Sequence, residues 1–242
     1  MRLVFVHTRA MLLSFGRYPA FAIPSVLLPT MFFVLFGLPN SHTPHRVVAA
    51  SFAAYAVLTV VFFLFGVGIA GERETPWESY LRTLPVHVSV RLAARVLAGF
   101  VFAAAAAGLL LTVAAVAGWA DFGARGWARF LVALIGGAVP LALMGIALGY
   151  WVSAKGALPV ANVLYLLFSY LGGLWTGPNG LPSIAERVAP FLPTRQWGDL
   201  LWPAVLGTPW RPQHWLALFG FTALFAALAA WGYRRDEGQR FR

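Results

Sequence analysis

The sequence predicts an all-α integral membrane protein with six transmembrane helices. Of its 242 residues, 60% are hydrophobic and 11% are charged, whereas a soluble domain typically carries about 25% charged residues. The mean hydropathy is +0.75. Six runs of roughly 20 apolar residues are long enough to cross the ~30 Å hydrocarbon core as helices, and we expect them to form one domain over residues 1–242. These spans are residues 18–39, 47–70, 96–118, 130–152, 157–175 and 214–233.

The segment before the first span is expected to form an interfacial helix. It begins "MRLVFVHTRAMLLSFGRYPAFA" and carries Arg9 and Arg17 where a cleaved signal peptide needs an uninterrupted apolar core. The first span is therefore expected to act as its own insertion signal, and the preceding amphipathic stretch to lie among the headgroups.

The distribution of charge predicts the orientation of the chain. Six spans place both termini on one side, and that side carries twelve of the eighteen Lys and Arg residues. The positive-inside rule then predicts that both termini are cytoplasmic. Tryptophans mark the interfaces at or near the predicted span ends, namely Trp119, Trp127, Trp151, Trp175, Trp215 and Trp231.

The spans contain little that would carry out chemistry. No Asp, Glu, Lys or Arg lies in the centre of a span, which argues against a proton-coupled carrier. No span serine has a G-x-S context, and His42 and His45 have no third ligand nearby. We therefore expect no catalytic site, no metal site and no cofactor. The net charge of +10 is dispersed along the chain, so nucleic acid is not an expected partner.

Small residues and prolines in the spans have two interpretations. Gly145 and Gly149 share one helix face, which favours close helix packing. Prolines remove a backbone donor and can kink a helix, so they mark either hinges beside a pathway or tolerated kinks. Aromatic side chains in the spans either line a route for an amphiphile or face lipid. The candidate hinge or pathway residues are Pro24, Pro29, Pro140, Phe32 and Phe62.

The stretch "GERETPWESYLRTLP", residues 71–85, predicts a short amphipathic helix between spans two and three. Thr75 suits the N-cap, with Pro76 first and Glu78 third in the helix. An apolar stripe follows at helical spacing, and Glu78 and Arg82 form an i, i+4 pair on the opposite face. The helix either rests in the headgroups or docks another protein. The charged "GERE" before it favours docking.

The run "ERETPWESYLRTLPV" resembles the cytoplasmic loop of ABC type-2 permeases. The matching positions are Glu72–Glu74 at the start, Trp77 and Glu78 in the middle, and residues 84–86 at the end. Thr75-Pro76 replaces the usual Gly-Thr of the family, which alters the turn but keeps a capping residue. The resemblance implies a coupling helix that presses against an ATPase. The implied coupling residues are Glu72, Arg73, Glu74, Thr75, Trp77, Glu78, Tyr80 and Arg82.

The segment 176–213, between spans five and six, is expected to form short outside helices. Ile184, Val188 and Phe191 recur on one helical face, and Thr194 is a candidate cap for a second helix around Trp197. The sequence pattern "LP…IA…PF.P" is similar to that of the region that re-enters or caps the outer leaflet in the same family.

The resemblance implies the permease subunit of a bacterial ATP-driven exporter, located in the plasma (inner) membrane. It would act as a homodimer in the lipid bilayer, and a separate ABC nucleotide-binding ATPase subunit would bind ATP and Mg. The chain cannot hold Walker A itself, because its single lysine, Lys155, lacks the G-x-x-x-x-G-K-[ST] context. The expected substrate is amphiphilic: a drug, a lipid-linked molecule or a polysaccharide. The alternatives are a secondary carrier or channel without an ATPase, or a non-transport membrane scaffold.

Overall fold

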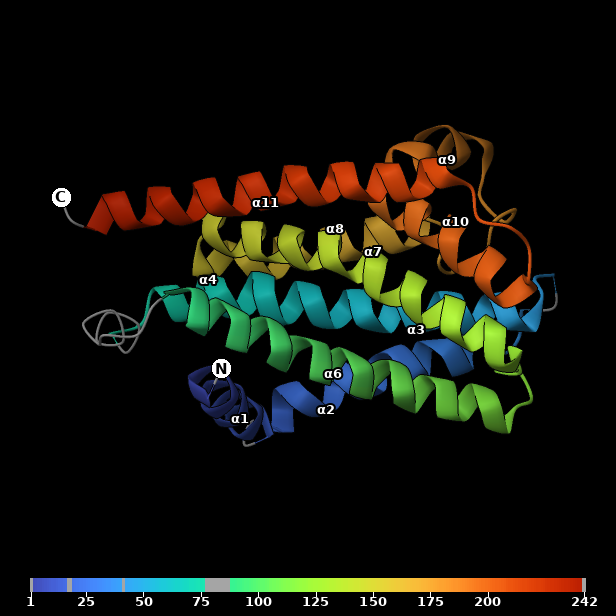
Figure 1. Cartoon of the computed structure of the whole chain (residues 1–242), viewed down its shortest axis with the longest axis horizontal. Helices are drawn as coiled ribbons and strands as arrows, with labels where there is room; N and C mark the ends of the chain where they lie inside the picture. Colours follow the sequence, from blue (N-terminus) through green and yellow to red (C-terminus); the bar gives the residue numbers. More distant parts are fainter. Residues whose placement is uncertain (1, 17–18, 41, 77–87, 241–242) are drawn as a thin grey trace.

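The computed structural model describes residues 2–16, 19–40, 42–76 and 88–240. In these ranges the chain forms helices joined by turns, with no strand. The long helices lie side by side along the long axis of the molecule (Figure 1). An all-helical arrangement satisfies each segment's backbone hydrogen bonds internally, as a hydrocarbon environment requires.

Five of the described helices are long and apolar enough to cross a membrane. They comprise His45–Arg73, Leu92–Val116, Gly123–Trp151, Ala154–Leu171 and Pro212–Glu237. The first combines α3 (His45–Val61), the π-helix η2 (Phe62–Val67) and α4 (Gly68–Arg73). The others lie within α6 (Val88–Val116), α7 (Gly123–Trp151), α8 (Ala154–Leu171) and α11 (Pro212–Arg240).

The first predicted span corresponds to a shorter apolar helix. α2 (Pro19–Phe32) continues directly into the π-helix η1 (Phe33–Gly37), and its apolar stretch falls among the shorter apolar helices, of 10–17 residues. Ahead of it, α1 (Arg2–Gly16) lies across the bundle and is seen nearly end-on (Figure 1). Thr8 Oγ1 at 3.3 Å from the carbonyl oxygen of Ala94 joins α1 to α6.

α3 is the central helix of the bundle. Every residue from Val47 to Val61 is buried, which fits a helix that is apolar on all sides. α2, α6, α7 and α10 all contact it. α8 and α11 are far less buried, since only 17% of the most apolar stretch of each helix is buried. Their outward faces are therefore available to lipid or to another chain.

The predicted close approach at Gly145 and Gly149 is confirmed. A Cβ at Gly145 would lie 2.8 Å from the carbonyl oxygen of Val61, and one at Gly149 would lie 2.8 Å from that of Phe65. α7 therefore packs closely against the end of α3 and the π-helix η2. Only glycine permits this separation, because any side chain would push the helices apart.

The two ends of the bundle differ in what they carry. α1, α4 and the last turns of α11 lie at one end, which we call the terminal end, and the short helices α9 (Ser183–Val188) and α10 (Pro193–Leu206) lie at the other, which we call the opposite end (Figure 1). The 3-10 helix η3 (Ala189–Phe191) links the two short helices. Short helices in this segment were expected from the sequence.

One expected cap in that segment is wrong. Leu192 is the N-cap of α10, and no side chain caps it. Thr194 lies inside the helix, where its hydroxyl donates to the carbonyl oxygen of Phe168 at 2.7 Å. The hydroxyl therefore ties α10 to the end of α8 instead of starting a helix.

Candidate functional site

At the terminal end, Arg73 joins three separate parts of the chain. Its Nη1 donates to the carbonyl oxygen of Tyr150 at 2.9 Å and to Asp236 Oδ1 at 3.0 Å. Its Nη2 donates to the carbonyl oxygen of Val152 at 3.0 Å. One guanidinium thus connects α4 to the end of α7 and to the last turns of α11, which the planar fork of arginine donors allows.

The two neighbouring glutamates hold two further helices. Glu72 forms an ion pair with Arg95 of α6. Glu74 Oε1 accepts the backbone N–H of Ala154, the first residue of α8, at 2.9 Å, where a carboxylate also complements the helix dipole. We call the set Glu72, Arg73, Glu74, Arg95 and Asp236 the charged clasp.

The clasp lies partly inside the protein. The side chains of Arg73 and Asp236 are 14% and 8% exposed, and that of Arg95 is 13% exposed. Charges this far from water persist only when they are paired. By contrast, Arg46 and Asp121 at the opposite end are 48% and 79% exposed. The clasp therefore fixes the ends of α4, α6, α7, α8 and α11 relative to one another.

The structure describes half of the predicted coupling residues. Glu72, Arg73 and Glu74 are brought together in the clasp, and the Thr75 hydroxyl donates to the carbonyl oxygen of Glu72 at 2.7 Å. The remaining predicted positions lie outside the described residues, so the short helix expected there stays a prediction. These positions are Trp77, Glu78, Tyr80 and Arg82.

A row of aromatic side chains runs between α2, α3 and α8. Trp175 contacts Phe36, Phe32 and Tyr55, with ring centroids 5.5–6.1 Å apart. Tyr55 contacts Tyr165 at 6.1 Å, and Tyr165 contacts Phe63 at 5.3 Å. The row therefore leads from the opposite end of the bundle to the π-helix η2. We call Phe36, Trp175, Phe32, Tyr55, Tyr165 and Phe63 the aromatic row.

The predicted pathway residues are only partly brought together. Phe32 belongs to the aromatic row, whereas Phe62 is fully buried and its neighbour Phe63 takes the place in the row. Pro24 is exposed, and Pro29 and Pro140 are buried. Each π-helix adjoins one predicted pathway residue, because η1 directly follows Phe32 and η2 begins at Phe62. Such segments occur frequently at functional sites.

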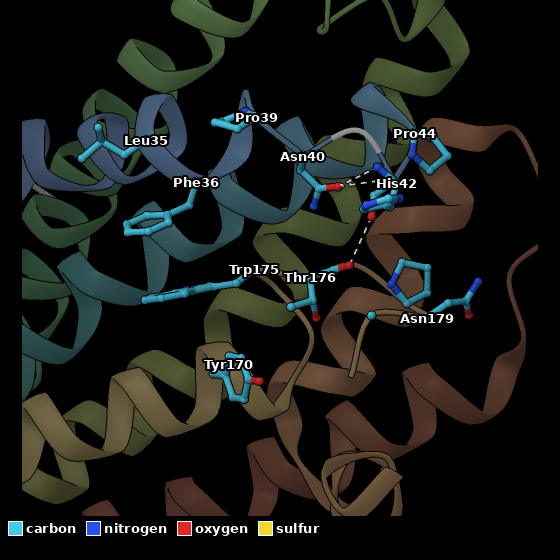
Figure 2. Close-up of a pocket in the computed structure, with 13 residues that line it drawn as sticks. Leu35, Phe36, Pro39, Asn40, His42, Pro44, Tyr170, Trp175, Thr176 and Asn179 are labelled. Carbon is cyan, nitrogen blue, oxygen red and sulfur yellow. Dashed lines mark hydrogen bonds between the residues drawn. The ribbon is translucent and has the colours of Figure 1, made fainter. Parts of the chain in front are cut away.

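A pocket of about 540 Å³ opens at the end of the aromatic row. Figure 2 shows the rings of Phe36 and Trp175 stacked along one wall, with Tyr170 of α8 beside them. Thr43 Oγ1 donates to the carbonyl oxygen of Thr176 at 3.2 Å, and both residues line the pocket. Trp175 Nε1 is buried without a hydrogen-bond partner among the described residues.

Comparison with known proteins places the chain in a family. A family model described as "ABC-2 family transporter protein" matches residues 18–231. The chain belongs to the ABC-2 transporter family. It is also 22% identical over 227 residues to a Bacillus subtilis (strain 168) protein named "Putative transport permease YvfS", with 91% of this chain and 93% of that protein covered. No solved structure matches the chain significantly.

Membership of the ABC-2 family makes the chain a membrane subunit of a transporter.

Sequence reasoning found the acidic and basic residues of "GERE" but missed their partners. Arg95 and Asp236 lie 23 and 163 residues from Glu72 and Arg73, and no local periodicity links positions so far apart. A search for carboxylates near the span ends would have identified Asp236 as a candidate for Arg73.

Proposed function

We propose that this ABC-2 protein is the permease subunit of an exporter driven by a separate ATPase. The predicted helix at 76–84 would press against that ATPase on the cytoplasmic side, and the charged clasp would pass its movement to the spans. In this proposal the chain itself binds no nucleotide and catalyses no reaction.

The observation that carries the proposal is the position of the charged clasp. It directly precedes the predicted coupling segment and holds the ends of five helices through Glu72, Arg73 and Glu74. A force applied to residues 76–84 would therefore reach α6, α7, α8 and α11 together. Membership of a family whose permeases work with ATPase subunits supports this partner.

The exposed apolar faces support a second copy of the chain as a partner. α2 exposes Leu27, Leu28 and Met31, and α8 exposes Val163 and Leu167. We propose that two copies meet near these helices, so that the aromatic row and its pocket border a route between them. Aromatic rings with a buried, unpaired indole N–H suit an amphiphile that carries hydrogen-bond acceptors, such as a drug, a lipid-linked molecule or a polysaccharide.

The test is co-purification of the tagged chain from its native host in mild detergent. We expect a stoichiometric P-loop ATPase and ATP hydrolysis in the same fraction. Glu78→Ala should leave hydrolysis intact and reduce transport by the reconstituted complex, because the coupling contact is lost. Glu186→Ala, an exposed carboxylate at the opposite end, is the matched control and should leave both activities unchanged.

Two results would contradict the proposal. Purification without any ATPase would favour the carrier, channel or scaffold alternatives. Transport by Glu78→Ala at the wild-type rate would show that the segment 76–84 does not couple hydrolysis to movement.

A further inference from the structure

One side of α7 begins with arginines and continues as an apolar surface. Arg125, Arg129, Val132, Gly136 and Val139 recur at three- and four-residue intervals, so they lie along one side of the helix. The first two residues lie at the opposite end of the bundle, and the last three lie deeper in the span. This order of charge followed by apolar surface matches the order within a phospholipid.

The charged part is a pocket of about 530 Å³ between α3, α7 and α10. Arg46, Arg125 and Arg129 line it, and its described lining contains no acidic side chain. Outside the pocket lining, Asp121 pairs with Arg46 at 3.2 Å and is itself 79% exposed. The N-terminus of α7 adds its dipole to the three guanidinium groups. We call this the arginine pocket, and it suits a phosphate group.

Arg129 is held ready for a ligand by its neighbours. Its guanidinium carbon lies 4.6 Å from the ring centroid of Trp210, and its Nη2 donates to the carbonyl oxygen of Thr208. Trp210 is fixed in turn, because its Nε1 donates to the carbonyl oxygen of Leu200 at 2.8 Å. A guanidinium stacked in this way keeps further N–H groups for an anion.

The apolar part is a groove of about 410 Å³ between α7 and α11. Trp215 lines the groove and contacts Trp210 with ring centroids 5.5 Å apart. Trp210 in turn lies against Arg129, so a chain of contacting side chains joins the groove to the arginine pocket. Trp215 lies against Gly136, where a Cβ would come within 2.6 Å of its ring. Val132 is 54% exposed and Phe219 is 67% exposed, so the groove is open to the lipid side.

The length of this surface matches one leaflet. Ten residues separate Arg129 from Val139, and these correspond to about 15 Å of helix. Half of the hydrocarbon core is also about 15 Å. Trp127, Trp210 and Trp215 lie near the charged end, where interfacial tryptophans belong.

We propose that an anionic phospholipid of the leaflet at the opposite end binds here, with its phosphate in the arginine pocket and one acyl chain in the groove. This bound lipid is distinct from the transported substrate. Its site lies between the start of α3, α7, α10 and α11, and no residue that lines it belongs to the aromatic row. The proposal depends on neither the ATPase nor the direction of transport, so its failure would leave the proposed function untouched.

The first test is lipid binding to the delipidated chain in detergent, followed by native mass spectrometry and thermal unfolding. We expect phosphatidylglycerol to bind and raise the Tm more than phosphatidylcholine does. Arg125→Gln should weaken phosphatidylglycerol binding about tenfold, as expected when a charge-assisted hydrogen bond is lost. Arg187→Gln, at an exposed arginine on α9, is the control and should bind the lipid as the wild type does.

The second test fills the groove. Val132→Trp places a large ring at an exposed groove position and should also weaken phosphatidylglycerol binding about tenfold. Leu131→Trp is the matched control, because Leu131 is 47% exposed on the same turn and does not line the groove. Both positions are open to the surroundings, so neither variant is expected to disturb the fold.

Three outcomes would overturn the proposal. Equal binding of phosphatidylcholine and phosphatidylglycerol would show that headgroup charge is not recognised. Equal stabilisation by inorganic phosphate would show a site for free anions. Equal binding to the Val132→Trp and Leu131→Trp variants would show that no acyl chain occupies the groove.

Discussion

At the residue scale, two ion pairs at opposite ends of the molecule have different environments. Arg73 and Asp236 are 14% and 8% exposed and lie 3.0 Å apart, whereas Arg46 and Asp121 are 48% and 79% exposed at 3.2 Å. The N–O distances of the two ion pairs are nearly equal, so the pairs differ mainly in their exposure to water. Water screens the outer pair, while removing one partner of the inner pair leaves a charge in a poorly solvated site.

This difference in exposure predicts that mutations at the two ion pairs lower the free energy of unfolding by unequal amounts. Asp236→Asn should lower the free energy of unfolding by about 3 kcal/mol, because the Arg73–Asp236 ion pair is lost inside the protein. Arg46→Gln should lower it by about 1 kcal/mol or less. Chemical unfolding in detergent would measure both values. A loss for Asp236→Asn no larger than that for Arg46→Gln would show that water reaches the clasp freely.

Residue-scale features were the hardest to predict from the sequence. The glutamates and arginine of "GERE" could be singled out because a cluster of both charges at a span end suits a docking surface. Their partners were not, because the Arg73–Asp236 pair exists only once α4 and α11 have packed together. Thr194 shows the same limitation, since its sequence context favoured a cap and tertiary packing turned its hydroxyl to α8 instead.

At the element scale, the five long apolar helices were predictable because each is governed by local composition and length. The structure starts α7 seven residues before the predicted span, at Gly123 instead of residue 130, since polar and aromatic residues also extend the helix. The contact of Gly145 and Gly149 with η2 was predictable as close packing, but the partner helix was not. The π-helices have no simple sequence signature and were not predicted.

The glycine contact predicts opposite effects for one substitution at two sites. Gly149→Ala should destabilise the protein by about 1–3 kcal/mol, because the new Cβ would overlap the carbonyl oxygen of Phe65. Gly108→Ala should be neutral or stabilise it by up to about 1 kcal/mol, because no atom lies within 4 Å of its Cβ position and alanine favours helix. Unfolding of both variants in the same detergent checks the pair. Equal effects would mean that α7 and η2 do not depend on close contact.

At the scale of the whole molecule, the number of membrane crossings depends on α2 and η1. α2 has 14 residues and η1 continues it by five without a break. Their combined length of about 28 Å is close to the ~30 Å thickness of the hydrocarbon core. If this helix crosses the membrane, the chain has six spans and both termini share one side. If it lies along the surface, five spans remain and the termini face opposite sides. The excess of arginines near both termini favours six.

The absence of cysteine makes this question directly testable. Single cysteines can replace three exposed arginines, Arg9 in α1, Arg187 in α9 and Arg234 in α11. In intact cells, a membrane-impermeant maleimide should label Arg187→Cys alone, and permeabilisation should add the other two. Labelling of Arg9→Cys together with Arg187→Cys before permeabilisation would mean that α2 does not cross. The segment 76–84 would stay on the side of Arg234 in either case, because four spans, the last of them α11, lie between the segment and Arg234. The proposed ATPase contact therefore requires only that Arg234→Cys be protected in intact cells, and labelling there would place the coupling segment outside, where no ATP is available.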